Sequence, residues 1–188
     1  MDRGRSSNDR LSAPTVIIVE HAPERAGRVL NAESACHICQ GPAVDARFER
    51  VQVWEDRWWR LITKLNGPVP GYSFLVPKRH IPYVTDLDGE EAATFGAVLA
   101  RVTKALRDEM SADLIYVHVF GGGVAHLHIH LAPHRSGDAL NDQVIRGAVT
   151  YERLPSGGAR LISHDFPMLP ESDHRAAAAG LRERLVGG

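Results

Sequence analysis

The chain is poor in cysteine and aromatic residues, and it carries no excess of charge of either sign. It has two cysteines in 188 residues, 6% aromatic residues, and a formal net charge of −1 from 22 basic and 23 acidic side chains. Two cysteines cannot build the disulfide framework of a small secreted domain. The balanced charge gives no cationic face for a nucleic-acid backbone or an anionic membrane. We therefore expect no nucleic acid and no membrane among the partners.

Long apolar runs are also missing from the sequence. No stretch approaches the roughly 20 residues that span a bilayer. Residues 1–14 are polar, with arginines but no apolar segment of signal-peptide length behind them. We expect residues 1–14 to be the disordered leader of a cytoplasmic protein. The rest has the length of one domain that buries a real hydrophobic core.

Hydrophobic patterning predicts strands, then one long helix, then further strands. Between Asp88 and Met110 apolar residues recur at spacings of three and four, with Asp88 as N-cap and Glu91 as its capping-box partner. This order favours an α+β fold with an antiparallel meander over a doubly wound sheet. The predicted strands are Thr15–Glu20, Phe48–Trp54, Trp58–Thr63, Tyr72–Val76, the buried strand Leu114–Phe120, and Ala125–Ala132 after a glycine turn. Weaker signals predict a helical turn at Ala26–Ser34, edge strands at Tyr151–Leu154 and Arg160–Ile162, and a terminal helix at Ser172–Leu185.

Residues 126–132 alternate imidazole with aliphatic side chains, in the order HLHIHLA. On a strand this period of two places His126, His128 and His130 on one face and the aliphatic residues in the core. Three neighbouring imidazoles can bind a metal, or they can hold a nucleophile beside groups that fix its tautomer and meet the charge of a phosphate. A purely structural strand has no reason to accept the repulsion between three titratable rings. The other histidines, taken singly, are expected to be core or surface residues.

Cys36 and Cys39 form a C-x-x-C pair, which has the spacing of half a zinc site. His80, at a strand end, and His126 are the best candidates for the other two ligands. A redox pair would open a helix after a buried strand, whereas Gly41-Pro42 follows the pair and is expected to block a helix. Zinc is therefore favoured over a redox pair or inert thiols.

The sequence resembles the histidine-triad (HIT) superfamily, whose signature H-φ-H-φ-H-φ-φ, with φ hydrophobic, matches residues 126–132. The segments VWED at 53–56 and PGYSFLVPKRH at 70–80, and the long helix after Asp86-Leu87, follow the order usual in that family. The likeness covers about residues 36–135. We expect a HIT-like domain over residues 15–135 and a C-terminal extension over 136–188 that packs on the same domain.

The resemblance implies an antiparallel sheet with one long helix, commonly a homodimer, and hydrolysis or transfer of a nucleoside monophosphate. The middle histidine of the signature is the family's nucleophile, which assigns that role to His128. Zinc-containing branches place the metal on positions that correspond to Cys36, Cys39, His80 and His126. The expected partner is a small nucleotide or nucleotide-like substrate, and the expected cofactor is zinc.

Candidate substrate contacts surround the triad. His130 shares its face, and the amides of Gly121, Gly122 and Gly123 form either an anion nest or only a tight hairpin turn. Candidates for a base-stacking wall are Trp54, Trp58, Trp59 and Phe74, although a tryptophan on a strand is more often a core residue. Lys64 stands where the family commonly carries an acid for the ribose hydroxyls. Gly122 and Gly123 replace the glutamine and serine or threonine that many members carry before the triad, so the nucleoside and the leaving group are expected to be unusual.

Two other functions compete with nucleotidyl transfer. In one, the zinc itself is the reactive centre, with water or substrate in an open position and His128 or His130 as acid–base. In the other, the domain binds a ligand without catalysis.

Overall fold

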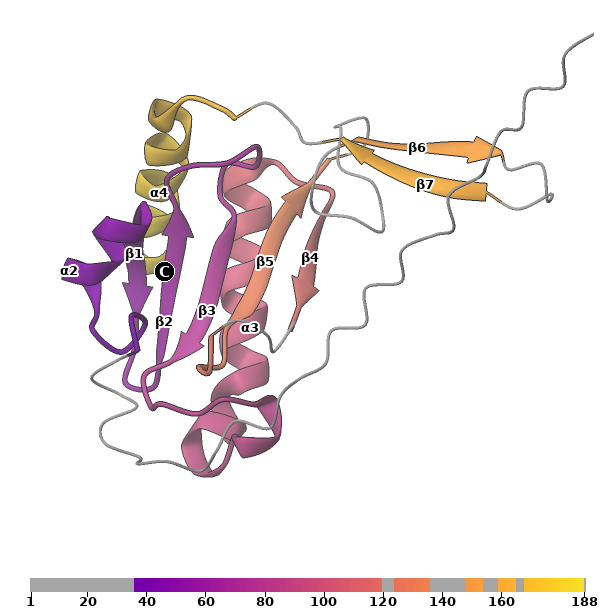
Figure 1. The fold of residues 1–188 in the computed structure, drawn as a ribbon. Helices are drawn as coiled ribbons and strands as arrows, with labels where there is room; N and C mark the ends of the chain where they lie inside the picture. Colours follow the sequence, from indigo (N-terminus) through magenta and orange to yellow (C-terminus); the bar gives the residue numbers. More distant parts are fainter. Residues whose placement is uncertain (1–35, 120–123, 136–147, 154–158, 165–167, 188) are drawn as a thin grey trace, which may run out of the picture. The chain divides into compact units, whose positions relative to one another are not determined.

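A five-stranded antiparallel sheet and one long helix form the main part of the fold (Figure 1). The computed structural model describes residues 36–119, 124–135, 148–153, 159–164 and 168–187. The strand order is β1-β2-β3-β5-β4. The elements are α2 (Pro42–Asp45), η1 (Ala46–Phe48), β1 (Arg50–Glu55), β2 (Trp59–Lys64), β3 (Ser73–Pro77), η2 (Val84–Asp86), α3 (Gly89–Met110), β4 (Leu114–His118), β5 (Ile129–His134), β6 (Ala148–Arg153), β7 (Ala159–His164) and α4 (Glu171–Val186). The predicted α+β class is confirmed, while the predictions for residues 1–35 and for the glycine turn at 121–123 lie outside the described residues.

Strand register separates the sheet into a helix-covered face and an open face. Trp54 pairs with Leu61, Leu61 with Leu75, and Leu75 with Ile129, so these side chains form one row on the face that α3 covers. One residue along, Gln52, Ile62, Phe74, His130 and His118 form the corresponding row on the open face. Because side chains alternate across a pleated sheet, the two rows face opposite ways. The histidines therefore belong to the open face.

The hydrophobic core lies between the sheet and α3, with α4 closing the end beside β1 (Figure 1). Val102 and Leu106 from α3 and Leu181 from α4 are fully buried in it. Gly180 allows α4 to approach α3, since a Cβ there would lie 2.0 Å from Oε1 of Glu109. Arg184 on α4 donates to that carboxylate at 2.6 Å. The predicted terminal helix is therefore real, and it contributes to the core of the sheet domain.

The start of α3 differs from the predicted capping box. Asp88 is the N-cap, but its side chain makes no capping hydrogen bond. Arg79 instead binds both carboxylates, with 2.8 Å to Asp88 and 2.6 Å to the buried Glu91. The prediction of a capping box was wrong because a guanidinium from the loop after β3 offers these acids a charged partner, which a backbone amide cannot match.

Two strand predictions also need correction. β4 ends at His118 and lies at the edge of the sheet, with Leu114 41% and Val117 43% exposed, so it is not a buried strand. The two short edge strands predicted in the tail are β6 and β7, which pair with each other in a separate two-stranded sheet.

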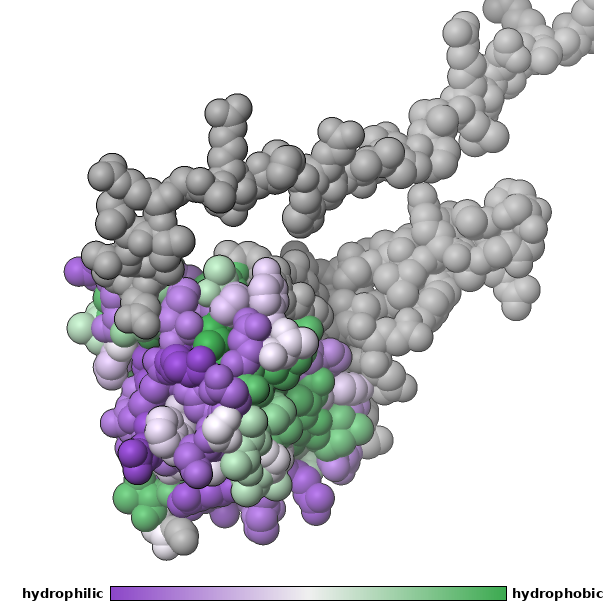
Figure 2. Space-filling view, turned by 90° about the horizontal axis from the view of Figure 1, so that it is seen from below, coloured by the Kyte–Doolittle hydropathy of each residue, from purple (hydrophilic) through white to green (hydrophobic). Residues whose placement is uncertain are grey.

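The described surface offers no membrane span. No helix among the described residues is both long and apolar enough to cross a bilayer. On the face seen in Figure 2, hydrophilic residues cover most of the described surface and hydrophobic residues gather in one area.

Candidate active site and metal centre

The C-x-x-C segment forms a tight loop on the open face of the sheet. The amide of Gln40 donates to the carbonyl of Cys36 at 3.2 Å, and Ile38 and Cys36 pack on Ile62 and Val76 of the sheet. Helix α2 begins directly after the loop at Pro42, so the expectation that Gly41-Pro42 blocks a helix was wrong. Proline suits the first helical position because its missing N–H has no intrahelical partner there, and Gly41 supplies the positive φ of 76° that precedes it.

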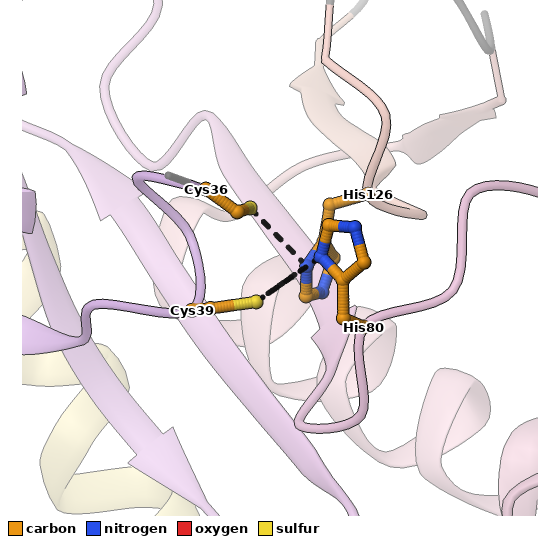
Figure 3. A group of neighbouring side chains, drawn as sticks. All are labelled: Cys36, Cys39, His80 and His126. Atoms are coloured by element: carbon orange, nitrogen blue, oxygen red, sulfur yellow. Dashed lines mark hydrogen bonds between the residues drawn. The ribbon is translucent and has the colours of Figure 1, made fainter. Parts of the chain in front are cut away.

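Cys36, Cys39, His80 and His126 converge on one point, as Figure 3 shows. Their ligand atoms all lie within 4.8 Å of one another. Cys39 Sγ is 3.2 Å from Nδ1 of His126 and 3.3 Å from Nδ1 of His80, and Cys36 Sγ is 3.5 Å from Nδ1 of His126. The structure thus brings together all four residues that the sequence singles out for a metal, although 41 or more positions separate the cysteines from the histidines.

The donor set and its dimensions fit zinc. Sulfur and nitrogen ligands of one tetrahedral zinc lie about 3.6 Å apart, given the usual bond lengths, and the three sulfur–nitrogen distances here are 3.2 to 3.5 Å. Both cysteines are free thiols. Two thiolates with two imidazoles match a closed structural zinc site.

His126 is oriented as a ligand by the backbone of β3. It is 1% exposed, and its Nε2 lies 2.9 Å from the carbonyl oxygen of Pro77. Because a carbonyl only accepts, Nε2 carries the proton and Nδ1 presents its lone pair to the cysteines. Burial lowers the pKa of His126 to about 4, which keeps the ring neutral as metal binding requires.

The histidine segment enters the sheet later than predicted. β5 begins at Ile129, so His126 and His128 precede the strand and only His130 lies within it. The reason is that the amide of Leu127 donates to Ile81 at 2.6 Å, outside the ladder. The alternation nevertheless persists, because Leu127 and Ile129 are buried in the core while His128 and His130 are half-buried with ring centroids 4.9 Å apart.

His128 has one ring nitrogen fixed by its own segment. Its Nδ1 lies 2.7 Å from the carbonyl oxygen of His126, so Nδ1 donates and Nε2 is left with the lone pair. The ring also packs edge-on to Phe74 at 6.3 Å between centroids. A neutral imidazole with a defined free nitrogen can act as a nucleophile.

His130 is held by a tyrosine that sequence reasoning missed. The Tyr72 hydroxyl lies 2.6 Å from Nδ1 of His130, and Phe74 packs edge-on at 5.0 Å. Burial, followed by repulsion from His128, lowers the pKa of His130 to about 4. The alternation within residues 72–76, read against the triad segment in the neighbouring strand, was the signal that could have found Tyr72. Phe74, already a candidate for the base-stacking wall, pairs with His130 and lies on the same face.

The remaining predicted contacts divide between the two faces. Lys64 lies at the end of β2 on the open face, with Nζ 6.0 Å from the Tyr72 ring. Trp54 lies on the opposite face, 8% exposed within the core, with Arg101 over its ring at 5.2 Å. Trp54 therefore does not share a face with the triad, and its placement in a base-stacking wall was wrong. Gly121, Gly122 and Gly123 lie outside the described residues.

Comparison with known proteins identifies the family. The profile of the HIT domain matches residues 48–137, which contain β1 to β5, α3 and the three histidines. Residues 48–137 are a domain of the histidine-triad superfamily. The cluster of two cysteines and two histidines has the donor set of a structural zinc site.

Two relatives and one solved structure show how far the likeness extends. An uncharacterized HIT-like protein of Mycobacterium tuberculosis is 29% identical over 96 residues, or 48% of this chain and 67% of that protein. The bis(5'-adenosyl)-triphosphatase of Dictyostelium discoideum is 28% identical over 99 residues, or 50% of this chain and 66% of that enzyme. A Zn-bound histidine triad family protein from Mycobacterium smegmatis shares the fold, with a TM-score of 0.54 and 23% identity over 83% of this chain and 99% of its own.

Proposed function

We propose that this protein is a nucleotidyl hydrolase or transferase that works through a nucleotidyl-histidine intermediate on His128. The observation that carries the proposal is the hydrogen bond from Nδ1 of His128 to the carbonyl of His126, which leaves Nε2 as the nucleophile. A Dictyostelium relative named as a bis(5'-adenosyl)-triphosphatase supports a nucleotide substrate.

In this mechanism Nε2 of His128 attacks phosphorus, and the bond to the leaving group breaks with its electron pair going to that group. Water or an acceptor hydroxyl then attacks the same phosphorus, breaks the phosphorus–nitrogen bond and restores the imidazole. His130 lies beside His128, and its N–H can donate to a phosphate oxygen. Two displacements replace one poor attack by water with two easier steps.

We propose that Cys36, Cys39, His80 and His126 hold a structural zinc. Bound there, zinc supplies a crosslink between the C-x-x-C loop, the end of β3 and the start of the triad segment. Four protein ligands leave no open position, which disfavours a reaction centred on the metal. The Zn-bound relative from Mycobacterium smegmatis supports this choice of metal.

We also propose that the protein is a homodimer. β4 pairs on one side only within the described residues, and it exposes Leu114 and Val117. An apolar edge strand is a natural place for a second copy to pair.

Intact-mass measurement after mixing with adenylated and uridylylated phosphoramidates tests the mechanism. We expect an adduct of one nucleotidyl group in the wild type and none in His128→Ala or His128→Gly. His134→Ala is the matched control, because His134 lies further along β5 on the same face. An adduct that persists without His128 would contradict the proposal. Turnover without His128 that a chelator abolishes would favour metal chemistry, and ligand binding without turnover would favour a binding module.

A further inference from the structure

A buried arginine links the metal loop to the sheet. Arg60 of β2 has a side chain that is only 9% exposed, and it lies on the open face beside Ile62. A buried guanidinium is costly unless each of its donors is satisfied. Its partners therefore indicate what the residue does.

Each of the three guanidinium nitrogens of Arg60 donates to a different segment. Nε donates to Oε1 of Gln52 on β1 at 2.6 Å, and one terminal nitrogen donates to the carbonyl oxygen of Ile38 at 2.8 Å. The other terminal nitrogen binds the carboxylate of Asp45 in α2, which is fully buried and also pairs with Arg50 at 3.2 Å. The planar fork of arginine suits such divergent contacts, which a lysine ammonium could not reproduce.

The contact with Ile38 is the one that bears on the metal. The Ile38 carbonyl belongs to the peptide unit between the two cysteines that joins Ile38 to Cys39. The same oxygen also accepts a hydrogen bond from the amide of Gly41, with 3.3 Å between nitrogen and oxygen, and this bond closes the turn. Fixing this peptide fixes the backbone direction of Cys39, whose Sγ lies near both histidine ligands.

We infer that Arg60, with Asp45 as its counter-ion, is a positioning residue of the metal site that holds the C-x-x-C loop by the Ile38 carbonyl so that both thiols face His80 and His126. This inference rests on the proposed zinc site. Groups that orient metal ligands from behind typically change metal affinity by about 10- to 100-fold when they are lost.

The test is the zinc affinity of the full chain, measured by competition with a chromophoric chelator well below the melting temperature. We expect Arg60→Met to weaken zinc binding about 10-fold or more. Arg60→Lys keeps the charge beside Asp45 and so protects the fold, but it should also bind zinc more weakly because one ammonium cannot reach all three acceptors. Arg184→Met is the matched control, since it breaks an arginine–carboxylate pair between α3 and α4 far from the loop in sequence.

Binding of cobalt gives a spectroscopic signal that a change in stability alone would not alter. At saturating Co²⁺, the thiolate-to-metal charge-transfer band of Arg60→Met should fall toward that of Cys36→Ser, which retains one thiolate. Wild-type zinc affinity in both Arg60 variants, or equal weakening in Arg184→Met, would overturn the inference alone. A wild-type protein that binds neither zinc nor cobalt would overturn the metal site itself.

Discussion

Two histidines that are two residues apart in the chain have opposite tautomers. The carbonyl of Pro77 accepts from Nε2 of His126, which leaves the lone pair on Nδ1, whereas the carbonyl of His126 accepts from Nδ1 of His128, which leaves the lone pair on Nε2. Both assignments follow from carbonyl oxygens, which cannot donate. A backbone group thus decides which of two chemistries the same side chain can perform.

The hydroxyl of Tyr72 should matter for turnover through His130. Tyr72→Phe removes the 2.6 Å contact to Nδ1 of His130, and with it the group that fixes that ring. A hydrogen bond of this kind is worth about 1 kcal/mol, so we expect the turnover number on a nucleotide phosphoramidate to fall roughly 5- to 10-fold with little change in KM. Steady-state kinetics of the purified variant, from reactions quenched at set times, measure both constants.

The exposed Tyr83 provides the control for that experiment. Tyr83→Phe makes the same chemical change at the N-cap of η2, outside the strands that carry Tyr72 and His130, and should keep wild-type rates. If Tyr72→Phe turned over as fast as the wild type, His130 would need no fixing by the hydroxyl.

For individual residues, the sequence predicted the candidate ligands and the triad better than it predicted the side chains that surround them. The C-x-x-C spacing and the alternating histidines depend on short-range geometry, and the structure brings the four candidate ligands together. The roles of Tyr72 and Arg60, and the face on which Trp54 lies, depend on which strands are neighbours in the sheet. That information lies in the sheet register and is not visible within any one segment.

Among the elements, α4 has a weak sequence signal and still contributes to the core. Its residues Leu181 and Leu185 are 0% and 2% exposed, although they belong to a tail with a weak sequence signal. His174 adds a buried contact from Nε2 to the carbonyl of Gly67 at 3.0 Å. The helix therefore forms part of the core that supports β1 and α3.

Shortening Leu181 should destabilise the whole domain. Leu181→Ala leaves a cavity in a fully buried position, and such changes cost about 2–5 kcal/mol. We expect the free energy of unfolding in urea to fall by that amount in a single transition. Val186→Ala, at 74% exposure on the same helix, should change it by less than about 0.5 kcal/mol. Separate transitions for α4 and for the sheet would show that the helix is not part of one cooperative unit.

Sequence periodicity located the elements but not all of their ends and partners. The predicted strands of the meander lie within two residues of β1, β2 and β3, because alternation and turn residues are local signals. The late start of β5 and the ion pairs of Arg79 come from tertiary contacts that compete with local preference.

For the molecule as a whole, the exposed edge at β4 predicts the oligomeric state. A lysine at Val117 would place a charge on this edge and oppose pairing with a second copy. We expect sedimentation equilibrium to give a dimer for the wild type and a mass near 20.6 kDa for Val117→Lys. Val186→Lys, at an exposed position on α4, should remain dimeric. A monomeric wild type would refute the proposed dimer.

The odd-numbered residues from 127 to 131 hold the fold together, while His128 and His130 face outward. The proposed chemistry and the packing of the core therefore belong to alternate residues of one short segment. Substitutions at His128 and His130 can change the chemistry of the open face during evolution with little risk to folding. Insertion or deletion of one residue in this segment would exchange the buried and the outward-facing side chains, and both the core and the site would be lost.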